Sequence, residues 1–349
     1  MDNALFLLHF NCEKIKKRGC VRMKAVYIEN KQLQIGERPK PTIQAGDVLL
    51  HIKAAGLNRR DLYTQNRLEQ QAPPLILGSD ASGIVEEVGA GVTHIAVGDE
   101  VIINPSLRWY EQSDVPPDDF EILSLPDDGT FAEYIAISAE QVEKKPAYLN
   151  FVEAATLGIA PLTGYRALVT KGAIREGQTV FIPGAGSGVA TFMIQFAKKK
   201  GARVIVSSRS EAKRQASLAI GADRAVANEE DWTDVLKDET IDLVIESVGR
   251  ATFNRSLAVL KKGGTVVVFG ATTEDFVEID LRTFFYAQQR ILGTTLGNRE
   301  EFREMLQFIE QHQLYPVIDR TFQLEEAEEA LQLLEKNQQF GKIVFEMNV

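Results

Sequence analysis

Cysteine is scarce in this 349-residue chain, which contains only Cys12 and Cys20. Both lie within the first 22 residues, so the rest of the chain can form no disulfide and can use no thiolate nucleophile. A long segment without cysteine fits a reducing compartment, and we expect a cytoplasmic protein.

Several other features are also missing. No apolar run is long enough to span a bilayer, and no segment is repetitive or of low complexity. The net charge is −10; the first 22 residues carry five basic and two acidic side chains, so the charge from residue 23 onward is −13. Since that part also lacks a basic cluster, nucleic acid is not expected as the main partner.

The first 22 residues differ from the rest of the chain. They contain no strand pattern, and their apolar run precedes their basic residues, which is the wrong order for a secretory signal. Met23 then opens a well-patterned strand, and residues 16–19 are what a purine-rich ribosome-binding site would encode if it were translated. We therefore predict that residues 1–22 are a non-native leader and that the functional protein starts at Met23; the alternative is an inert tail.

Two patterns divide the remaining chain. Residues 23–148 are typical of a β-barrel domain, with short strands separated by glycine turns at 24–28, 48–54, 81–88 and 100–103. Residues 149–299 alternate between helix and strand, which predicts an α/β domain with a doubly wound parallel sheet. Its strands are expected at 179–182, 203–206, 225–226, 243–246, 265–269 and 291–296, and its helices at 151–157 and before residues 170, 200 and 220. Residues 300–349 are expected to return to the first domain through helices 300–311 and 324–337 and a final strand, 342–346.

The most informative segment is 184–188, GAGSG, which follows an apolar strand and precedes an amphipathic helix. Glycine at such a turn lets the backbone approach a pyrophosphate, and the helix N-terminus provides oriented N–H groups. The spacing is not a strict G-x-G-x-x-G, but the succession of strand, loop, helix and strand predicts a dinucleotide site. We expect its contacts to come from Gly186, Ser187, Gly188 and Val189.

The next strand ends at residues 207–210, SSRS, and Lys213 follows one helical turn later. An NAD enzyme places a carboxylate here to bind the ribose hydroxyls, whereas hydroxyl, guanidinium and ammonium groups attract a 2′-phosphate. We therefore predict NADP(H), bound through Ser208, Arg209 and Lys213, rather than NAD(H). The alternative is that Arg209 and Lys213 are ordinary solvated charges.

With a glycine-rich barrel ahead of such a unit, the chain resembles the medium-chain dehydrogenase/reductase superfamily, most closely its zinc-free quinone and enone reductases. The resemblance covers residues 23–349. It rests on 54–62 (AAGLNRRDL), 77–85 (LGSDASGIV), 98–101 (GDEV), 129–134 (GTFAEY), 162–165 (LTGY), 184–190 (GAGSGVA) and 341–344 (GKIV). It implies a GroES-like catalytic barrel, a Rossmann domain, and a homodimer paired through the edge strand 291–296.

The zinc-dependent branch of that superfamily has a cysteine in the slot of Asn58, a His-Glu pair in the slots of Ser79 and Asp80, and another cysteine near Ile159. None of these ligands is present here. A catalytic zinc requires three protein ligands, usually nitrogen or sulfur. The resemblance therefore implies that there is no catalytic zinc.

That branch also has a structural zinc lobe with four cysteines. The corresponding segment, 106–126, contains no cysteine. The resemblance implies no structural zinc, and Trp109, Tyr110 and Phe120 are expected to pack in place of the metal.

The resemblance also implies catalytic residues. Asn58 is the first candidate to donate a hydrogen bond from its amide to the substrate carbonyl, and Tyr63 is the second. The alternatives are a turn residue in left-handed conformation for Asn58 and a partly buried aromatic for Tyr63. Asp61 is expected to orient the loop or cap a helix.

Further cofactor contacts are expected from six residues. The resemblance implies Thr163 and Lys342, for which helix packing and a solvated edge-strand lysine are the alternatives. The other four follow strand ends at the carboxyl edge of the sheet, where ligands bind: Ser247, Gly270, Ala271 and the backbone of Leu296.

These features favour one reaction. Without a metal, oxidation of an alcohol requires a placed base, whereas reduction of a polarised C=C bond requires only a hydrogen-bond donor and water besides the cofactor. We therefore expect an NADPH-dependent, zinc-independent reductase of quinones or α,β-unsaturated carbonyls, with substrate walls from residues 63–74 and 106–126. The alternatives are a zinc-type alcohol dehydrogenase or aldehyde reductase, and a non-catalytic NADPH-binding sensor.

Overall fold

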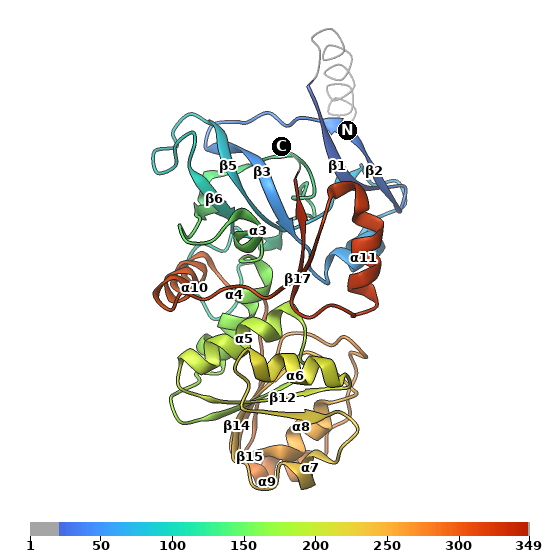
Figure 1. Ribbon diagram of the computed structural model, residues 1–349, viewed down its shortest axis with the longest axis vertical. Helices are drawn as coiled ribbons and strands as arrows, with labels where there is room; N and C mark the ends of the chain where they lie inside the picture. The colour runs from blue at the N-terminus through green and yellow to red at the C-terminus, as the bar shows by residue number, and fades with distance from the viewer. Residues whose placement is uncertain (1–20, 348–349) are drawn as a thin grey trace.

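The computed structural model describes residues 21–347, which form two domains stacked along the long axis of the molecule (Figure 1). The predicted leader lies outside the described residues except for its last two positions. The first strand begins at Arg22, so it includes one residue of that predicted leader.

Apart from a two-stranded pair in segment 106–126, the first domain is built from two sheets of mainly antiparallel strands. The smaller sheet has the order β2 (Gln32–Pro39), β1 (Arg22–Glu29) and β4 (Leu75–Ile76). The larger has the order β10 (Val142–Lys144), β6 (Glu100–Ile103), β5 (Asp80–Val88), β3 (Asp47–Gly56), β18 (Lys342–Glu346) and β17 (Ile318–Phe322), and β9 (Tyr134–Ser138) also pairs with β3. Because β18 pairs with the end of β3, the C-terminal strand lies next to the segment that carries Asn58.

The second domain contains the predicted parallel sheet. Its order is β13 (Arg224–Ala227), β12 (Arg203–Ser208), β11 (Thr179–Pro183), β14 (Ile241–Glu246), β15 (Leu260–Val268) and β16 (Arg290–Gly293). The helices between these strands are α5 (Gly188–Lys199), α6 (Glu211–Ala219), α7 (Trp232–Val235), α8 (Phe253–Val259) and α9 (Leu281–Ala287). The strand order reverses between β11 and β14, and open α/β sheets bind their ligands at such a point.

Strand β11 shows why a short apolar run predicts this sheet. All five of its residues are buried. Val180 and Ile182 pack into the core shared with α5, while Phe181 faces the opposite cluster and meets Trp232 edge to face, with ring centroids 4.9 Å apart. A strand with helices on both faces must be apolar on both sides.

The helix predicted to end at residue 170 is divided. After the short α3 (Phe151–Ala154), α4 covers Ile159–Tyr165 and a π-helix continues over Arg166–Lys171. Arg166 is buried, and its Nη1 donates to Glu301 Oε2 at 2.6 Å. Its Nη2 donates to the carbonyl oxygens of Ser113 and Asp114. An apolar pattern cannot predict these contacts, because the partners of Arg166 lie far away in the sequence.

Two of the three aromatic residues predicted to pack within segment 106–126, Trp109 and Phe120, are in contact. Strands β7 (Ser106–Leu107) and β8 (Glu121–Ile122) close it. Trp109 is buried and meets Phe120 edge to face, with ring centroids 5.4 Å apart. The Arg166 guanidinium lies 4.6 Å from the Trp109 ring centroid, so the same arginine joins this segment to the Rossmann domain. Tyr110 lies outside this pair and contacts Arg299 instead.

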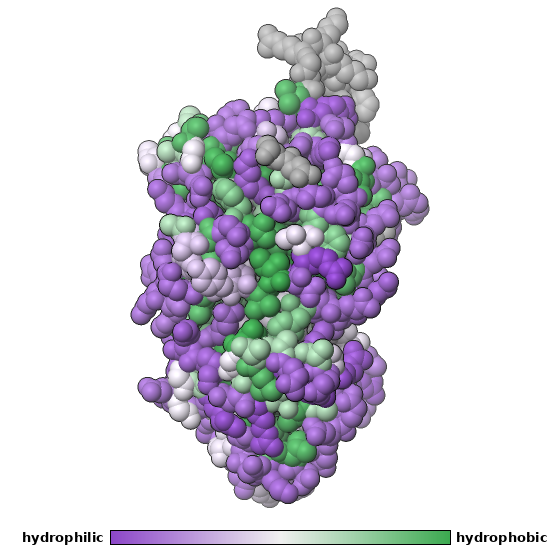
Figure 2. Space-filling model, viewed as in Figure 1, coloured by the Kyte–Doolittle hydropathy of each residue, from purple (hydrophilic) through white to green (hydrophobic). Residues whose placement is uncertain are grey.

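The C-terminal segment contacts both domains. Helix α10 (Arg299–Gln311) packs on α4, and it is followed by β17, the 3₁₀ turn Leu324–Glu326, α11 (Ala327–Glu335) and β18. On the face shown in Figure 2, hydrophilic residues dominate and hydrophobic residues gather in a band through the middle of the molecule. Within residues 21–347, no helix has the length and apolarity needed to cross a bilayer.

Candidate active site

The loop between β11 and α5 requires glycine at several positions. Gly184 and Gly186 have φ angles of 79° and 111°, in the region that residues with a side chain rarely adopt. A Cβ on Gly186 would lie 2.7 Å from Lys213 Cδ, and one on Gly188 would lie 2.6 Å from Lys342 Cδ. The loop is therefore flanked by two of the lysines that the sequence assigned to the cofactor.

The start of α5 has the features of a pyrophosphate site. Ser187 caps the helix, its Oγ accepting the N–H of Ala190 at 3.1 Å, and the helix N-terminus points its N–H groups toward the loop. At the neighbouring end of β12, Ser207 Oγ is buried and has no hydrogen-bond partner among residues 21–347. These features suit a nicotinamide dinucleotide. The glycine backbone lets a pyrophosphate approach, and the helix N-terminus and the unsatisfied hydroxyl offer it hydrogen-bond donors.

The predicted 2′-phosphate residues lie at the end of β12. Ser208 is buried, and its Oγ accepts the N–H of Ser210 at 3.2 Å. Arg209 is exposed, and no hydrogen bond or ion pair of its guanidinium is found within the described part of the chain. Lys213 donates to the carbonyl oxygen of Asn337 at 2.6 Å, and burial lowers the pKa of its ammonium group. Of these two cations, Arg209 is therefore the one without a protein partner among the described residues.

Thr163 and Val189 lie where α4 meets α5. Thr163 is buried. Burial agrees with the predicted cofactor contact, and it agrees equally with the alternative that Thr163 only packs inside the helix. A Cβ on the neighbouring Gly164 would lie 3.5 Å from Val189 Cγ1, so these helices approach each other closely at the start of α5.

The residues after β14 and β15 also lie together. A Cβ on Gly270 would be 3.6 Å from the carbonyl oxygen of Ser247, and one on Gly249 would be 3.0 Å from the Cβ of Ala271. Glu246, which sequence reasoning missed, holds this turn: its fully buried carboxylate accepts the N–H of Val248 at 2.7 Å and hydroxyl bonds from two residues of the following segment, Thr252 and Ser256. The sequence contained one indication of this role, namely an acidic residue at the end of an otherwise apolar strand.

The prediction that the last strand reaches Leu296 was wrong, because β16 ends at Gly293. Leu296 follows in a left-handed conformation, with φ of 30°, and is buried. Such backbone is strained for a residue with a side chain and often occurs at functional sites. The next residue, Gly297, lies against Leu162 of α4, so Leu296 turns beside the helix that carries Thr163.

Asn58 lies in a buried polar cluster beside the glycine loop. Lys342 Nζ donates to the carbonyl oxygen of Leu57 at 2.6 Å, to Asn58 Oδ1 at 2.7 Å and to Asp80 Oδ2 at 3.3 Å. Asp80 Oδ1 accepts the N–H of Ile159 at 2.8 Å. Asn58, Asp80 and Lys342 are 7%, 0% and 3% exposed, so this ammonium lies in the protein interior. A solvated edge-strand position for Lys342 was therefore wrong, and Asn58 has no left-handed backbone.

Asp61 begins α2 (Asp61–Arg67) and orients the Asn58 loop, as predicted. Its Oδ2 accepts the backbone N–H of Asn58 at 2.7 Å, and its Oδ1 is buried without a partner among the described residues. Burial raises the pKa of Asp61 to about 7, against the opposing effects of the Asn58 hydrogen bond and the Arg60 charge. The carboxyl group therefore keeps its proton to a higher pH than an exposed aspartate does.

The other polar residues of this loop have partners of their own. Arg60 Nη1 donates to Ser79 Oγ and to the carbonyl oxygen of Leu123, at 2.6 Å each, which ties the loop to segment 106–126. Tyr63 is 42% exposed, and its hydroxyl accepts from Arg59 Nε at 3.3 Å. The structure thus places Asn58, and not Tyr63, in the cluster beside the glycine loop.

The residues in the zinc slots do not fit a zinc ion. The hydroxyl of Ser79 is bonded to Arg60 and Leu123, and the amide oxygen of Asn58 and one carboxylate oxygen of Asp80 are bonded to Lys342. Zinc prefers thiolate and imidazole. In residues 21–347, no group of three or more His, Cys, Asp or Glu side chains is arranged as metal ligands are.

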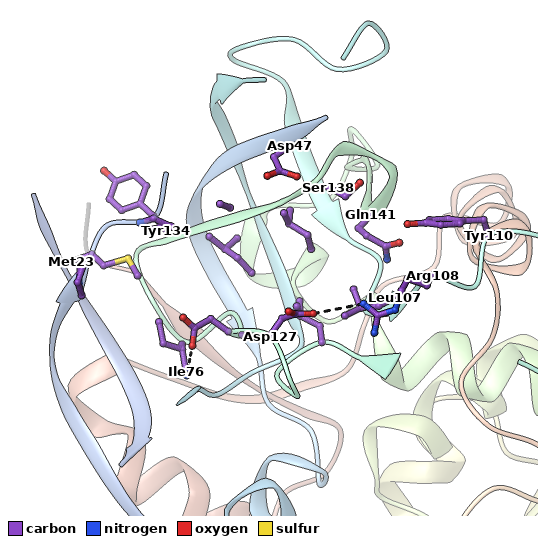
Figure 3. Close-up of a pocket in the computed structure, with 18 residues that line it drawn as sticks. Met23, Asp47, Ile76, Leu107, Arg108, Tyr110, Asp127, Tyr134, Ser138 and Gln141 are labelled. Atoms are coloured by element: carbon purple, nitrogen blue, oxygen red, sulfur yellow. Dashed lines mark hydrogen bonds and ion pairs between the residues drawn. The ribbon is translucent and has the colours of Figure 1, made fainter. Parts of the chain in front are cut away.

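A cavity of about 380 Å³ lies elsewhere in the barrel domain (Figure 3). Its walls come from β1, β9 and the segment that follows β6, and include Tyr134 and the ion pair between Arg108 and Asp127, 3.8 Å apart. Leu107 and Leu123 belong to the predicted substrate wall 106–126, but none of the predicted catalytic or cofactor residues lines this cavity. We therefore locate the candidate active site between the glycine loop and Asn58.

Comparisons with known proteins agree with this architecture. Two family models match: the alcohol dehydrogenase GroES-like domain over residues 44–147 and the zinc-binding dehydrogenase over residues 188–311. An alcohol dehydrogenase of Geobacillus stearothermophilus is 31% identical, the match covering 93% of this chain and 100% of the relative. A crotonyl-CoA reductase of Streptomyces avermitilis is 27% identical over 90% of this chain and 81% of the relative. The solved structure of a quinone oxidoreductase from Coxiella burnetii superposes with a TM-score of 0.77 at 30% identity, covering 94% of this chain and all of that one.

The fold, the glycine loop and these matches define a nicotinamide-dependent oxidoreductase with a GroES-like barrel and a Rossmann domain. The chain belongs to the medium-chain dehydrogenase/reductase superfamily. The family and the fold class expected from the sequence are thereby confirmed.

Proposed function

We propose that this protein is an NADPH-dependent, zinc-independent reductase of quinones or α,β-unsaturated carbonyl compounds. One observation carries the proposal: the zinc slots of the superfamily hold Asn58, Ser79 and Asp80, and the ammonium of Lys342 is bonded to Asn58 and Asp80. A site that offers hydrogen-bond donors but no set of zinc ligands is suited to reducing a polarised C=C bond.

In this proposal the residues of the site have the following roles. When bound along the glycine loop, the reduced nicotinamide supplies a hydride to the β-carbon of the acceptor. Asn58 donates a hydrogen bond from Nδ2 to the carbonyl oxygen, where negative charge develops as the enolate forms. The α-carbon then takes a proton from water, so hydride and proton together add across the double bond. Asp61 fixes the Asn58 backbone through the 2.7 Å bond to its N–H.

The preference for NADPH rests on the end of β12. No carboxylate follows this strand directly; Ser208 and Arg209 occupy the positions that meet the ribose. The Arg209 guanidinium is exposed and unpaired within the described residues, so a 2′-phosphate gains a partner there without breaking an existing ion pair.

The names of the relatives support two reaction classes. A crotonyl-CoA reductase and a quinone oxidoreductase act on conjugated acceptors, which agrees with our proposal. The alcohol dehydrogenase at 31% identity supports the alternative, oxidation of an alcohol. The residues around Lys342 favour the first class, because Asn58 and Asp80 at the zinc slots are already bonded to the lysine and leave no open metal position.

The test is a screen of NADPH oxidation against enones, enoyl thioesters, quinones, aldehydes and alcohols, with NADH as the control cofactor. We expect turnover with a conjugated acceptor and no change after exhaustive chelation. Activity confined to aldehydes or alcohols would contradict the reaction class. Loss of activity on chelation, restored by zinc, would contradict zinc independence. Tight NADPH binding without turnover would favour a sensor.

We also propose a cytoplasmic homodimer. Strand β16 is the outer strand of the Rossmann sheet, and exposed apolar side chains lie on the adjoining α9 and just before it: Phe276, Leu281, Phe285 and Tyr286. An uncovered edge next to apolar side chains favours pairing with a second copy.

A further inference from the structure

We propose that Lys342 is a positioning residue that fixes the orientation of the Asn58 amide, in place of the cofactor contact expected from the sequence. This inference rests on the proposed role of Asn58 as the donor to the substrate carbonyl. It assigns the ammonium to the catalytic loop, although the lysine belongs to the last strand, 284 residues away.

The first argument is the hydrogen-bonding capacity of the ammonium group. It has three N–H donors and no acceptor. All three have protein acceptors: the carbonyl of Leu57, the amide of Asn58 and the carboxylate of Asp80, at 2.6, 2.7 and 3.3 Å. At 3% exposure, the lysine has no donor left for a cofactor phosphate.

The second argument is the orientation of the amide. Because an ammonium accepts no hydrogen bond, Asn58 must turn its oxygen toward Lys342, and a flipped amide would place NH₂ against NH₃⁺. The NH₂ group is thereby directed away from the lysine, where its only bond within the described chain is a long one to the carbonyl of Gly56, at 3.4 Å. One N–H of Nδ2 remains available to a substrate carbonyl.

The third argument is the path of the lysine side chain. Gly341 donates its N–H to the carbonyl of Gly186 at 2.9 Å, so β18 starts at the glycine loop. The Lys342 stem then passes Gly188, where a Cβ would come within 2.6 Å of its Cδ. The side chain thus runs from the dinucleotide loop to Asn58, and its length connects the two halves of the site.

The charge of the lysine is balanced within the cluster. Asp80 contributes a carboxylate that is itself held by the N–H of Ile159, and Gly158 leaves the space for it, since a Cβ there would lie 2.2 Å from Asp80 Oδ1. Residues at two zinc slots of the superfamily, Asn58 and Asp80, therefore bind an organic cation. It orients a hydrogen-bond donor, whereas a zinc ion would bind the substrate oxygen directly.

The test is a double-mutant cycle with Lys342→Met and Asn58→Ala, measured with the carbonyl acceptor that the wild-type protein reduces fastest. Removing one oriented donor to a developing oxyanion typically lowers kcat by about 10²- to 10³-fold. We expect each single variant to lose kcat on this scale, with little change in the KM for NADPH. The double variant should lose little more than either single variant, because both remove the same donor. Additive losses would overturn the proposal.

The control for folding is Lys342→Met combined with Asp80→Asn, which removes both charges from the interior. We expect this variant to keep the wild-type melting temperature within a few degrees and to retain the low kcat. A return of kcat to the wild-type value would mean that the unpaired carboxylate, and not the lost amide orientation, causes the defect.

Two binding measurements separate this proposal from the cofactor role and from the proposed function. If Lys342 binds the cofactor pyrophosphate beside the glycine loop, Lys342→Met should raise the Kd for NADPH and the Kd for NADH alike, because both cofactors carry that group; such a result would overturn the proposal. The side-chain amide resonances of Asn58, identified as those absent from Asn58→Ala, should shift in Lys342→Met even if no acceptor is turned over. Unchanged resonances would also overturn it, whereas a substrate other than an enone would contradict only the proposed function.

Discussion

The buried carboxyl of Asp61 gives the most direct quantitative prediction. Burial raises its pKa to about 7 in the folded protein, from a reference value of 3.8. Folded Asp61 therefore keeps its proton to higher pH than unfolded Asp61. Between these two values unfolding releases a proton, so the protein loses stability as the pH rises. The interval is about 3 units, each worth about 1.4 kcal/mol, so ionised Asp61 costs the folded state about 4 kcal/mol.

The perturbation is Asp61→Asn, which cannot ionise but can still accept the Asn58 N–H through its amide oxygen. The assay is urea unfolding between pH 5 and pH 8, followed by the fluorescence of Trp109 and Trp232, which are buried in different parts of the molecule. The free energy of unfolding of the variant minus that of the wild type should rise by roughly 3 kcal/mol over this range. Any constant offset from burying the amide NH₂ cancels in that change.

The matched control is Asp99→Asn. Asp99 Oδ2 accepts the N–H of Ala96 at 3.0 Å, also three residues away in the chain, but in a partly exposed turn of the same domain. Its difference from the wild type should stay flat across the pH range. If Asp61→Asn gives an equally flat difference, burial does not raise the Asp61 pKa and the reasoning is wrong.

Three further predictions concern other parts of the molecule. Arg209→Ala should raise the KM for NADPH by about tenfold or more and leave NADH kinetics nearly unchanged, because the guanidinium meets only the 2′-phosphate; equal effects on both cofactors would refute the assignment. Arg166→Met should lower the free energy of unfolding by about 3–5 kcal/mol by leaving Glu301 buried without its partner. Adding Glu301→Gln should recover part of that loss in the same urea assay, and no recovery would point to the carbonyl contacts of Arg166 instead. Phe285→Glu on α9 should convert the proposed dimer to a monomer in analytical ultracentrifugation, and a variant that sediments as the wild type does would place the interface elsewhere.

Much of the fold was predictable because the sequence patterns that indicate strands and turns are local. Strands β6 and β18 have the bounds predicted from the sequence, Glu100–Ile103 and Lys342–Glu346, since apolar β-branched runs bounded by glycine or charge have few alternatives. The tight turn at 184–188 was also predictable, because glycines between an apolar strand and an amphipathic helix allow the positive φ angles observed at Gly184 and Gly186. Two details were not predicted: the division of the helical segment before residue 171 into α3, α4 and a π-helix, and the end of β16 at Gly293.

The candidate site likewise has some features that were predictable from the sequence and others that were not. The sequence by itself determined which side chains are available: an amide at position 58, no thiolate after residue 22, and an arginine where an NAD enzyme has a carboxylate. Only the tertiary structure decided what they contact. The pairing of β18 with β3 brings Lys342 to Asn58 and Asp80, and the packing of α10 on α4 joins Arg166 to Glu301. The physical reason is that a buried charge must find its partner in space, and sequence periodicity reports which face of a strand or helix is apolar but not which distant polar group lies against it.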